Sequence, residues 1–283
     1  MLKVLSVPKQ VTVEIAAVGN ELLNGTTLDT NSHWLCEHLD HLGMKVQRKT
    51  TIRDELGAIA NCFRECITRK PDWIISVGGL GPTFDDMTIE GLAKALRRSL
   101  VLDDRALAML KASYSRRAKK LGAKKNRLSI SAMKMAKIPL NSKPLSNPVG
   151  SAPGVLAKAG KTRIVALPGV PKEMMGIFQL EVAPLLELNA TVRVREAWLK
   201  ISGISESALA PRINKIAGRY APSIYIKSHP KGFQRGKSIL NIQLRSTSLK
   251  DDKVATSDLE NAALEVLQAA EILGADARRI RSI

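Results

Sequence analysis

Three features are scarce or missing in this sequence, and each absence excludes a class of protein. The 283 residues contain no apolar run that approaches the roughly 20 residues of a membrane-spanning helix. The three cysteines lack C-x-x-C spacing, which supports neither a disulfide framework nor a zinc site. Met1–Gln10 is too short and too polar for a secretory signal peptide. We therefore expect a cytoplasmic protein without a membrane partner.

Acidic residues are missing from a long central part of the chain. Between Arg105 and Lys172 there is no Asp or Glu, while 16 residues are Lys or Arg, and the whole chain has a net charge of +18. Such a segment favours nucleic acid or an anionic small ligand, although a solvated basic face has the same composition. Aromatic residues make up only 4% of the chain, and Tyr114 alone lies in this segment. Stacking of single-stranded bases on it is therefore poorly supported.

A glycine-rich turn lies in Trp73–Asp86, which reads W-I-I-S-V-G-G-L-G-P-T-F-D-D. Its apolar run ends in Gly78-Gly79, and Gly81-Pro82 closes the turn before a predicted helix. A strand that runs through glycines into a helix presents backbone N–H groups to a phosphate. The spacing is neither that of a Walker loop nor that of a dinucleotide-binding fold. A tight turn with a helix cap is the simpler alternative.

Two adjacent carboxylates, Asp85 and Asp86, follow this turn. They would repel a phosphate unless a cation or a basic side chain lies between them, which points to a divalent metal ion. Of the two, Asp86 is our candidate for the site, and Asp85 is expected to face solvent.

Predicted strands and helices alternate through the first part of the chain. Strands over 11–18, 44–52 and 73–77 are separated by helices over 33–42 and 55–69, which predicts βαβ units and a mostly parallel sheet. Ligands of such sheets bind beyond the carboxyl ends of the strands. Glu21, Asp54 and Asp86 each follow a predicted strand, so we expect them to meet at one sheet edge. Asp54 is also a candidate cap of the helix that follows it.

The pattern changes after Asn189. Strands over 191–201, 223–228 and 238–246 and helices over 205–218 and 251–274 form a β-α-β-β-α unit. We therefore predict two domains, residues 1–189 with an α/β fold and residues 190–283 with a smaller α+β fold. Pro139–Pro153 is predicted to be a long loop of the first domain.

Five motifs in this order resemble the CinA family. They are V-G-N-E-L-L-N-G-x-x-x-D-T-N (Val18–Asn31), T-T-I-R-D (Thr50–Asp54), V-G-G-L-G-P-T-F-D-D-M-T (Val77–Thr88), N-P-V-G-S-A-P-G (Asn147–Gly154) and A-L-P-G-V-P-K-E-M (Ala166–Met174). CinA belongs to the superfamily of MoaB/MogA-type molybdopterin-binding domains. Residues 191–274 resemble the CinA middle domain more weakly. No stretch resembles the C-terminal deamidase domain of bacterial CinA proteins, so we do not expect deamidation of NMN.

The resemblance implies a three-layer α/β fold with a mostly parallel sheet and a nucleotide or pterin site at the sheet edge. It also implies metal-dependent hydrolysis of ADP-ribose or a related dinucleotide, with AMP as a product. The partners we expect are a small nucleotide or pterin ligand, a divalent metal ion and further copies of the chain in a homo-oligomer. Leu80 and Thr83 within the glycine turn depart from the molybdenum-enzyme pattern and favour CinA.

The candidate site residues combine the chemistry with the motifs. Hydrolysis of a pyrophosphate needs charge neutralisation and an activated water, which carboxylates, a metal and backbone N–H groups can supply. The candidate catalytic residues are Asp54 and Asp86, and the candidate metal ligands are Asp86, Asp54 and Glu21. The candidate ligand- and phosphate-binding residues are Asn31, Gly78, Gly79, Gly81, Pro82, Thr83, Asn147, Gly150, Ser151, Gly154, Pro168 and Gly169. For Asn31 and Asn147, stabilisation of a loop by an Asx-turn is the alternative.

Two other functions compete with hydrolysis. One is a binding or transferase role in molybdenum cofactor synthesis. The other is a basic nucleic-acid-binding module, which the net charge and the small C-terminal domain suggest. Against it, no G-x-x-G loop joins two helices as a KH fold requires, because Gly232 and Gly236 are spaced G-x-x-x-G between two strands.

Overall fold

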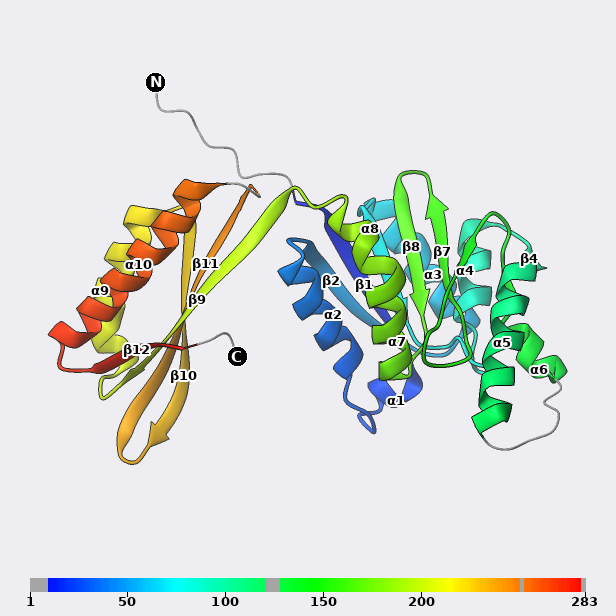
Figure 1. The fold of residues 1–283 in the computed structure, drawn as a ribbon, viewed down its shortest axis with the longest axis horizontal. Coiled ribbons are helices and arrows are strands. Elements are labelled where there is room, and N and C mark those ends of the chain that lie inside the picture. The colour runs from blue at the N-terminus through cyan, green and yellow to red at the C-terminus, as the bar shows by residue number, and fades with distance from the viewer. Residues whose placement is uncertain (1–9, 121–127, 250–251, 281–283) are drawn as a thin grey trace, which may run out of the picture. The chain divides into compact units, whose positions relative to one another are not determined.

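The structure, a computed structural model, describes residues 10–120, 128–249 and 252–280. These residues form two compact units, of which one is Val11–Ala190 and the other is built on the residues from Thr191 onward (Figure 1). Within the described residues, no helix has the length and apolar character needed to cross a membrane.

The first unit contains a six-stranded mixed sheet, as the alternation of elements predicted. Its strand order is β2-β1-β3-β8-β7-β6; β1 is parallel to β2 and β3, β3 is parallel to β8, and β7 is antiparallel to both β8 and β6. The strands are β1 (Thr12–Val18), β2 (Lys45–Ile52), β3 (Trp73–Val77), β6 (Lys143–Leu145), β7 (Gly154–Ala159) and β8 (Thr162–Leu167); β4 (Leu100–Leu102) pairs separately with β5 (Lys137–Pro139).

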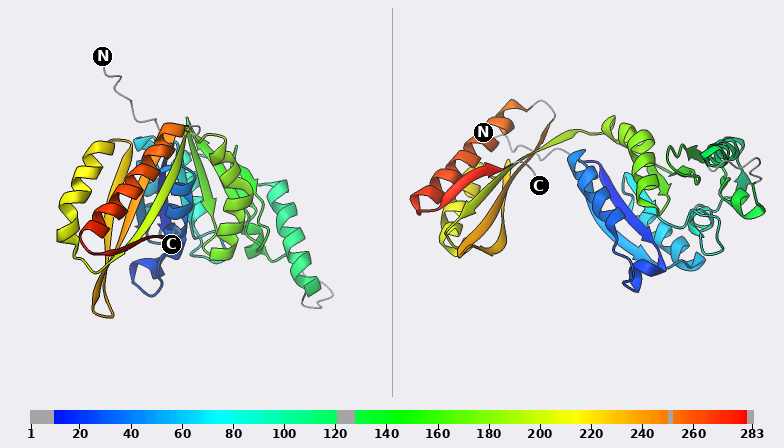
Figure 2. Two further views of the ribbon diagram at one scale, coloured as in Figure 1. Left: turned by 60° about the vertical axis from the view of Figure 1, so that its left-hand side comes forward. Right: turned by 60° about the horizontal axis from the view of Figure 1, so that its bottom comes forward.

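Helices cover both faces of this sheet, which gives the three layers that the family resemblance implied (Figures 1 and 2). On one face Val13, Ile75 and Val165 pack against α2, α7 and α8. On the other face Ile74 and Ile164 pack against α3 and α4. The helices of the unit are α1 (Asn20–Leu23), α2 (Thr30–His41), α3 (Leu56–Arg69), α4 (Thr88–Leu96), α5 (Asp104–Lys120), α6 (Ile130–Lys134), α7 (Pro171–Ile177) and α8 (Ala183–Glu187), the last two joined by a π-helical turn, Phe178–Val182.

The predicted loop Pro139–Pro153 is partly wrong, because it contains the strand β6. Pro144 hid this strand, since proline cannot donate to a sheet ladder. However, β6 is an edge strand that pairs with β7 alone, a position where proline is tolerated.

The second unit has one more strand than the sequence predicted. A four-stranded antiparallel sheet of order β10-β11-β9-β12 packs one face on two helices, and β12 pairs with the edge of β9. Two consecutive arginines in β12 hid the apolar alternation of a strand. The elements are β9 (Val192–Ser202), α9 (Glu206–Tyr220), β10 (Ile224–Gln234), β11 (Lys237–Leu249), α10 (Lys253–Ile272) and β12 (Asp276–Ile280).

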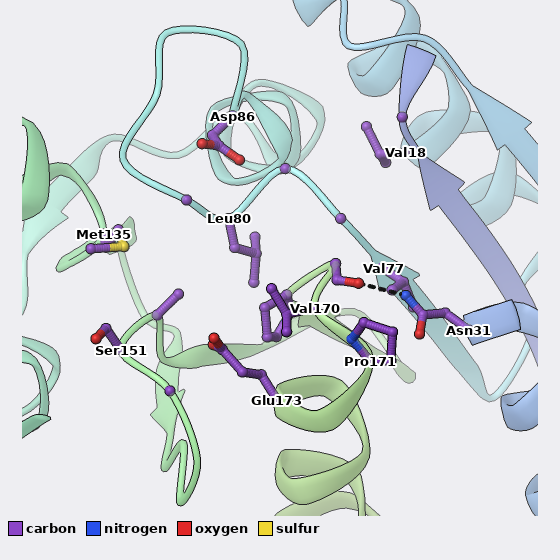
Figure 3. A pocket seen from close by; sticks show the side chains of 18 of the residues that line it. Val18, Asn31, Val77, Leu80, Asp86, Met135, Ser151, Val170, Pro171 and Glu173 are labelled. Atoms are coloured by element: carbon purple, nitrogen blue, oxygen red, sulfur yellow. Dashed lines mark hydrogen bonds between the residues drawn. The ribbon is translucent and has the colours of Figure 1, made fainter. Parts of the chain in front are cut away.

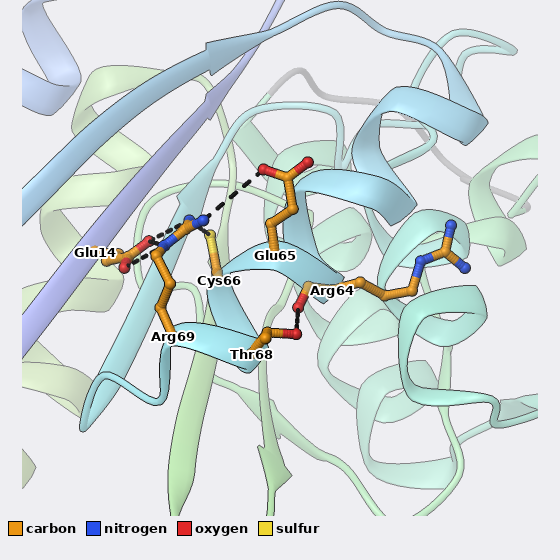
Figure 4. A network of polar contacts seen from close by, with 6 residues as sticks. All are labelled: Glu14, Arg64, Glu65, Cys66, Thr68 and Arg69. Carbon is orange, nitrogen blue, oxygen red and sulfur yellow. Dashed lines mark hydrogen bonds and ion pairs between the residues drawn. The ribbon is translucent and has the colours of Figure 1, made fainter.

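An ion pair with a buried carboxylate joins α3 to β1 in the first unit. The guanidinium of Arg69 contacts both carboxylate oxygens of Glu14, at 2.7 and 2.8 Å in the closest pairs, and it also reaches the Cys66 sulfur (Figure 4). The Glu14 side chain is 3% exposed, whereas that of Glu65, which also faces Arg69 at 3.8 Å, is 71% exposed. Burial by itself would raise the pKa of Glu14, but the hydrogen bonds and charge of Arg69 lower it below its usual value of 4.5.

We predict that Glu14→Gln lowers the free energy of unfolding at pH 7 by about 1–3 kcal/mol, because it leaves a polar group buried beside Arg69. Since the folded-state pKa of Glu14 is depressed, its stabilisation is present above the unfolded-state pKa and is lost as pH falls through the folded-state value. Urea unfolding between neutral and acidic pH measures both effects. The matched control is Glu65→Gln, for which we expect a change below about 0.5 kcal/mol; equal losses in the two variants would contradict the assignment.

Candidate functional site

A cavity of about 910 Å³ opens where the parallel strands of the first unit end. It is lined by the loops that follow β1, β2, β3 and β8, together with α5 and the segment Pro148–Ala152 (Figure 3). The carboxyl ends of parallel strands meet at one sheet edge, so this is where the sequence placed the site. Its volume falls within the range of pockets that hold cofactors and nucleotides.

The glycine turn after β3 is fixed on two sides. Gly78 and Gly79 have φ angles of +103° and +66°, which favour glycine. The Gly78 N–H donates to the Leu167 carbonyl at the end of β8, and the Thr88 hydroxyl donates to the Gly78 carbonyl from the start of α4. Among the described residues, the N–H groups of Gly79, Leu80 and Gly81 have no hydrogen-bond acceptor, although all three residues line the cavity. These groups are available to an anionic ligand.

Asp54 does not cap the helix that follows it, so the prediction of Asp54 as a helix cap is wrong. Glu55 is the N-cap residue of α3, and no side chain bonds that end of the helix. Instead, the Asp54 carboxylate accepts a 2.7 Å hydrogen bond from the Asn20 N–H at the start of α1. Burial raises the pKa of Asp54, the charges of Glu21, Asp85 and Asp86 raise it further, and the Asn20 hydrogen bond opposes them.

Asp86 is held by the turn that it follows. One of its carboxylate oxygens accepts from the Thr83 N–H at 2.8 Å and lies within hydrogen-bond distance of the Thr83 hydroxyl. That hydroxyl also lies 2.5 Å from Asp85, and its single proton can serve only one carboxylate at a time. Asp85 is exposed, and the hydrogen bond from Thr83 lowers its pKa. Asp86 is less exposed than Asp85, but both residues line the cavity, so the structure does not separate them as the prediction did.

Asn147 stabilises a loop and does not line the cavity. Its side-chain oxygen accepts from the N–H groups of Val149 and Gly150, and its amide nitrogen donates to the Ala152 carbonyl at 2.8 Å and to the Glu173 carboxylate at 2.6 Å. This is the Asx-turn alternative. The N–H of Gly150 is thus already used, and the carboxylate of Glu173 lies against Gly150, where a Cβ would come within 1.9 Å of it.

Glu173 lines the cavity, although it is not among the predicted site residues. It lies in the first turn of α7, and Figure 3 shows it well separated from Asp86, with Leu80 between them in this view. Its place in the A-L-P-G-V-P-K-E-M motif was the available signal.

Asn31 lines the cavity and holds the loop after β8. Its amide nitrogen donates to the Gly169 carbonyl at 2.7 Å (Figure 3). Its side-chain oxygen is buried and has no hydrogen-bond partner among the described residues. A buried oxygen of this kind is a ready acceptor for a hydroxyl or amine of a ligand.

Part of the basic segment faces the cavity. Arg116 and Arg117 of α5 line it, and Ser113 anchors the same helix by a 2.8 Å hydrogen bond to the Gly150 carbonyl. Residues 121–127, which also belong to the basic segment, lie outside the described residues.

The structure brings most of the predicted site residues to this cavity. Three predicted residues do not line it. The side chains of Thr83 and Asn147 form hydrogen bonds with two carboxylates that do, Asp86 and Glu173, and Gly154 is buried at the start of β7. The predicted residues that line the cavity are Glu21, Asn31, Asp54, Gly78, Gly79, Gly81, Pro82, Asp86, Gly150, Ser151, Pro168 and Gly169.

The carboxylates do not by themselves form a metal cage. Across residues 10–120, 128–249 and 252–280, no three His, Cys, Asp or Glu side chains are grouped closely enough to hold an ion. One oxygen each of Asp54 and Asp86 is already an acceptor for backbone N–H groups. The predicted set Asp86, Asp54 and Glu21 therefore does not fit a resident ion in this arrangement.

Comparison with known proteins places the chain in a family. The family described as "Probable molybdopterin binding domain" matches residues 14–188, and the chain belongs to it. Within that family it is similar to the crystal structure of the protein CinA with unknown function from Thermoplasma acidophilum. The two share 40% identity and a TM-score of 0.54 over 59% of this chain and 94% of that one.

Relatives of nearly full length are also found. A protein of Aeropyrum pernix is 41% identical over 258 residues, which cover 91% of this chain and 90% of that one. A protein of Sulfurisphaera tokodaii is 40% identical over 241 residues, which cover 85% and 88%. The match to the CinA protein of Thermoplasma acidophilum confirms the resemblance to the CinA family that the five sequence motifs indicated.

We predict that Gly78→Ala lowers the free energy of unfolding by at least about 2 kcal/mol. The residue has a left-handed φ, and its Cβ would lie 2.2 Å from the Val18 carbonyl oxygen, which belongs to backbone and cannot move aside. Urea unfolding provides the measurement. Gly57→Ala, in the first turn of α3 with no atom within 4 Å of the added Cβ, is the control and is expected to stabilise by up to about 1 kcal/mol. Equal stability of wild type and Gly78→Ala would refute the close approach.

Proposed function

We propose that the first unit hydrolyses the pyrophosphate bond of ADP-ribose or a related dinucleotide in the presence of a divalent metal ion. The observation that carries this proposal is the joint placement of unpaired N–H groups at Gly79–Gly81 and the carboxylate Asp54 in one cavity. The N–H groups suit phosphate oxygens, and a carboxylate with a raised pKa suits a proton acceptor. The family match supports a nucleotide or pterin ligand at this position.

The reaction that this arrangement supports is an in-line displacement at phosphorus. The oxygen of a water molecule forms a bond to the phosphorus of the adenylate, and the bond from that phosphorus to the bridging oxygen breaks. Asp54 accepts the proton of the water, and AMP and a sugar phosphate leave. Asp86 is fixed by Thr83, and Arg116 and Arg117 provide positive charge for the phosphates.

The divalent metal ion belongs, in this proposal, to the substrate complex. Mg²⁺ commonly uses only one or two carboxylates together with substrate phosphate oxygens, so it does not require a preformed cage of three. Six carboxylates and two arginines line the cavity, and a polyanion there needs a compensating cation. Asp86 and Glu21 are the proposed carboxylates for this contact, and Asp54, the third member of the predicted set, is assigned to the base.

We expect purified protein with Mg²⁺ or Mn²⁺ to cleave the pyrophosphate of at least one of ADP-ribose, FAD, NAD and CoA, with release of AMP from the first three or of adenosine 3′,5′-bisphosphate from CoA. Asp54→Asn keeps the shape of the side chain and removes the base, so kcat should fall by at least about a hundredfold. In the wild type, kcat/KM should rise with pH to a plateau, because the base works deprotonated and the pKa of Asp54 is raised.

Glu55→Gln is the matched control for this experiment, because it removes the neighbouring carboxylate, which does not line the cavity. Its activity should equal that of the wild type. Metal-loaded protein that leaves all four dinucleotides intact would refute the proposal, as would an Asp54→Asn variant of full activity.

A second candidate function is binding of molybdopterin. The carboxylate of Glu173, held by Asn147 on the cavity wall, suits the amine and ring N–H donors of a pterin. The same family description supports it.

If the protein binds molybdopterin, pterin fluorescence should appear after oxidation of protein purified from a host that makes the cofactor. Glu173→Gln should lower the recovered pterin by about tenfold or more, because it loses a charge-assisted hydrogen bond. The control is Glu181→Gln, a carboxylate of the same helical segment outside the cavity. Pterin-free preparations that also fail to bind added molybdopterin would exclude this role.

A further inference from the structure

Among the described residues of the second unit, no helix covers one face of the four-stranded sheet. Both α9 and α10 pack on the other face, where Leu199, Ile242 and Leu244 are buried against Leu209 and Val266 (Figures 1 and 2). The order β-α-β-β-α-β with the strands arranged β10-β11-β9-β12 is that of the split βαβ fold. Alternate residues of the strands therefore form an open surface within this unit, which we call the sheet face.

Charge is divided between the two sides of this unit. The four strands and the turn residue Arg235 carry ten Lys or Arg and two Asp or Glu, whereas α9 and α10 carry four Lys or Arg and five Asp or Glu. On the sheet face, Lys200, Lys227 and Arg278 form no ion pair with another described residue. The register puts Arg193, Arg195 and Arg279 on the face that α9 and α10 cover. On the sheet face it puts four cations, Lys200, Lys227, Arg245 and Arg278, and two carboxylates, Glu196 and Asp276. The sheet face thus has an excess of positive charge, which suits a polyanion.

Aromatic rings lie among these cations. Trp198 and His229 approach with ring centroids 5.3 Å apart, and His229 lies within hydrogen-bond distance of the side chain of Gln243 at 3.2 Å. Tyr225 is 59% exposed, and with Lys227, His229 and Gln243 it lines a cavity of about 550 Å³. In the strand register, Lys227, Gln243 and Trp198 lie directly opposite one another on neighbouring strands. Two residues further along each strand, on the same face, lie His229, Asn241, Lys200 and Arg278.

We propose that the sheet face binds single-stranded nucleic acid. Bases stack on Trp198 and Tyr225, and phosphates contact Lys200, Lys227 and Arg278. Flat sheets that interleave aromatic rings with cations bind unpaired bases, because every base has a stacking face that a duplex conceals.

The aromatic rings distinguish this ligand from an acidic polypeptide. Charge alone would attract either polymer, but a polypeptide of carboxylates gains nothing from Trp198 or Tyr225. This placement also differs from the basic segment of the first unit, where Tyr114 was the only aromatic residue.

The test is a binding titration of the full chain with labelled single-stranded RNA and DNA of about 12 nucleotides and with a duplex of the same sequence. We expect the single strands to bind more tightly than the duplex at low salt. Three phosphate contacts predict that log K falls with log salt with a slope of about −2, and Lys227→Ala should reduce that slope by about 0.7. Lys215→Ala, on the exposed side of α9, is the charge-matched control and should leave the slope unchanged.

Stacking is tested by substitution of the aromatic residues. Tyr225→Ala and Trp198→Ala should each weaken binding by about tenfold, while Trp198→Phe should retain most of the affinity. Because Tyr225 is largely exposed, its variant keeps the proposal testable even if Trp198→Ala impairs folding. Equal affinity for the single strand and the duplex would overturn the proposal, as would complete displacement of RNA by polyglutamate of equal charge. So would binding that is lost in Arg116→Ala and unchanged in Tyr225→Ala.

Discussion

The close approach of Gly78 to the backbone of Val18 is the constraint on which the candidate site depends. No side chain fits between the end of β3 and the end of β1, because a Cβ at Gly78 would lie 2.2 Å from the Val18 carbonyl oxygen. The same glycine is bonded through its N–H to Leu167 at the end of β8. Three parallel strands therefore end at one level, and the loops that follow them converge on a single cavity.

The electrostatics of this cavity contrast with those of the whole chain. The protein carries a net charge of +18, yet the cavity is lined by more carboxylates than cations. Burial raises the pKa of Asp54, and the neighbouring carboxylates raise it further. Asp86 and Glu173 accept hydrogen bonds from Thr83 and Asn147, so protein groups position both carboxylates.

Sequence reasoning recovered the parts of the site that local pattern encodes. The order of strands and helices predicted the sheet edge, and the glycine turn and Asp54 were found there. It failed where a contact joins distant segments: the partner of Asp54 is Asn20, and the partner of Glu173 is Asn147. It also failed for two of the four edge strands of the two larger sheets, because β6 contains a proline and β12 two arginines. These strands are stabilised by pairing with a neighbour rather than by apolar alternation.

The sequence by itself determined the family, the alternation of elements and the residues that follow each strand, because these are properties of adjacent positions. Only the tertiary structure decided which of those residues share the cavity, that Asn147 holds a loop, and that α5 contributes Arg116 and Arg117. It also decided that Trp198, Tyr225, Lys200 and Lys227 of the second unit lie on one face of a sheet. Burial, hydrogen-bond partners and strand register depend on segments far apart in the chain, and the physical properties of the site arise from them.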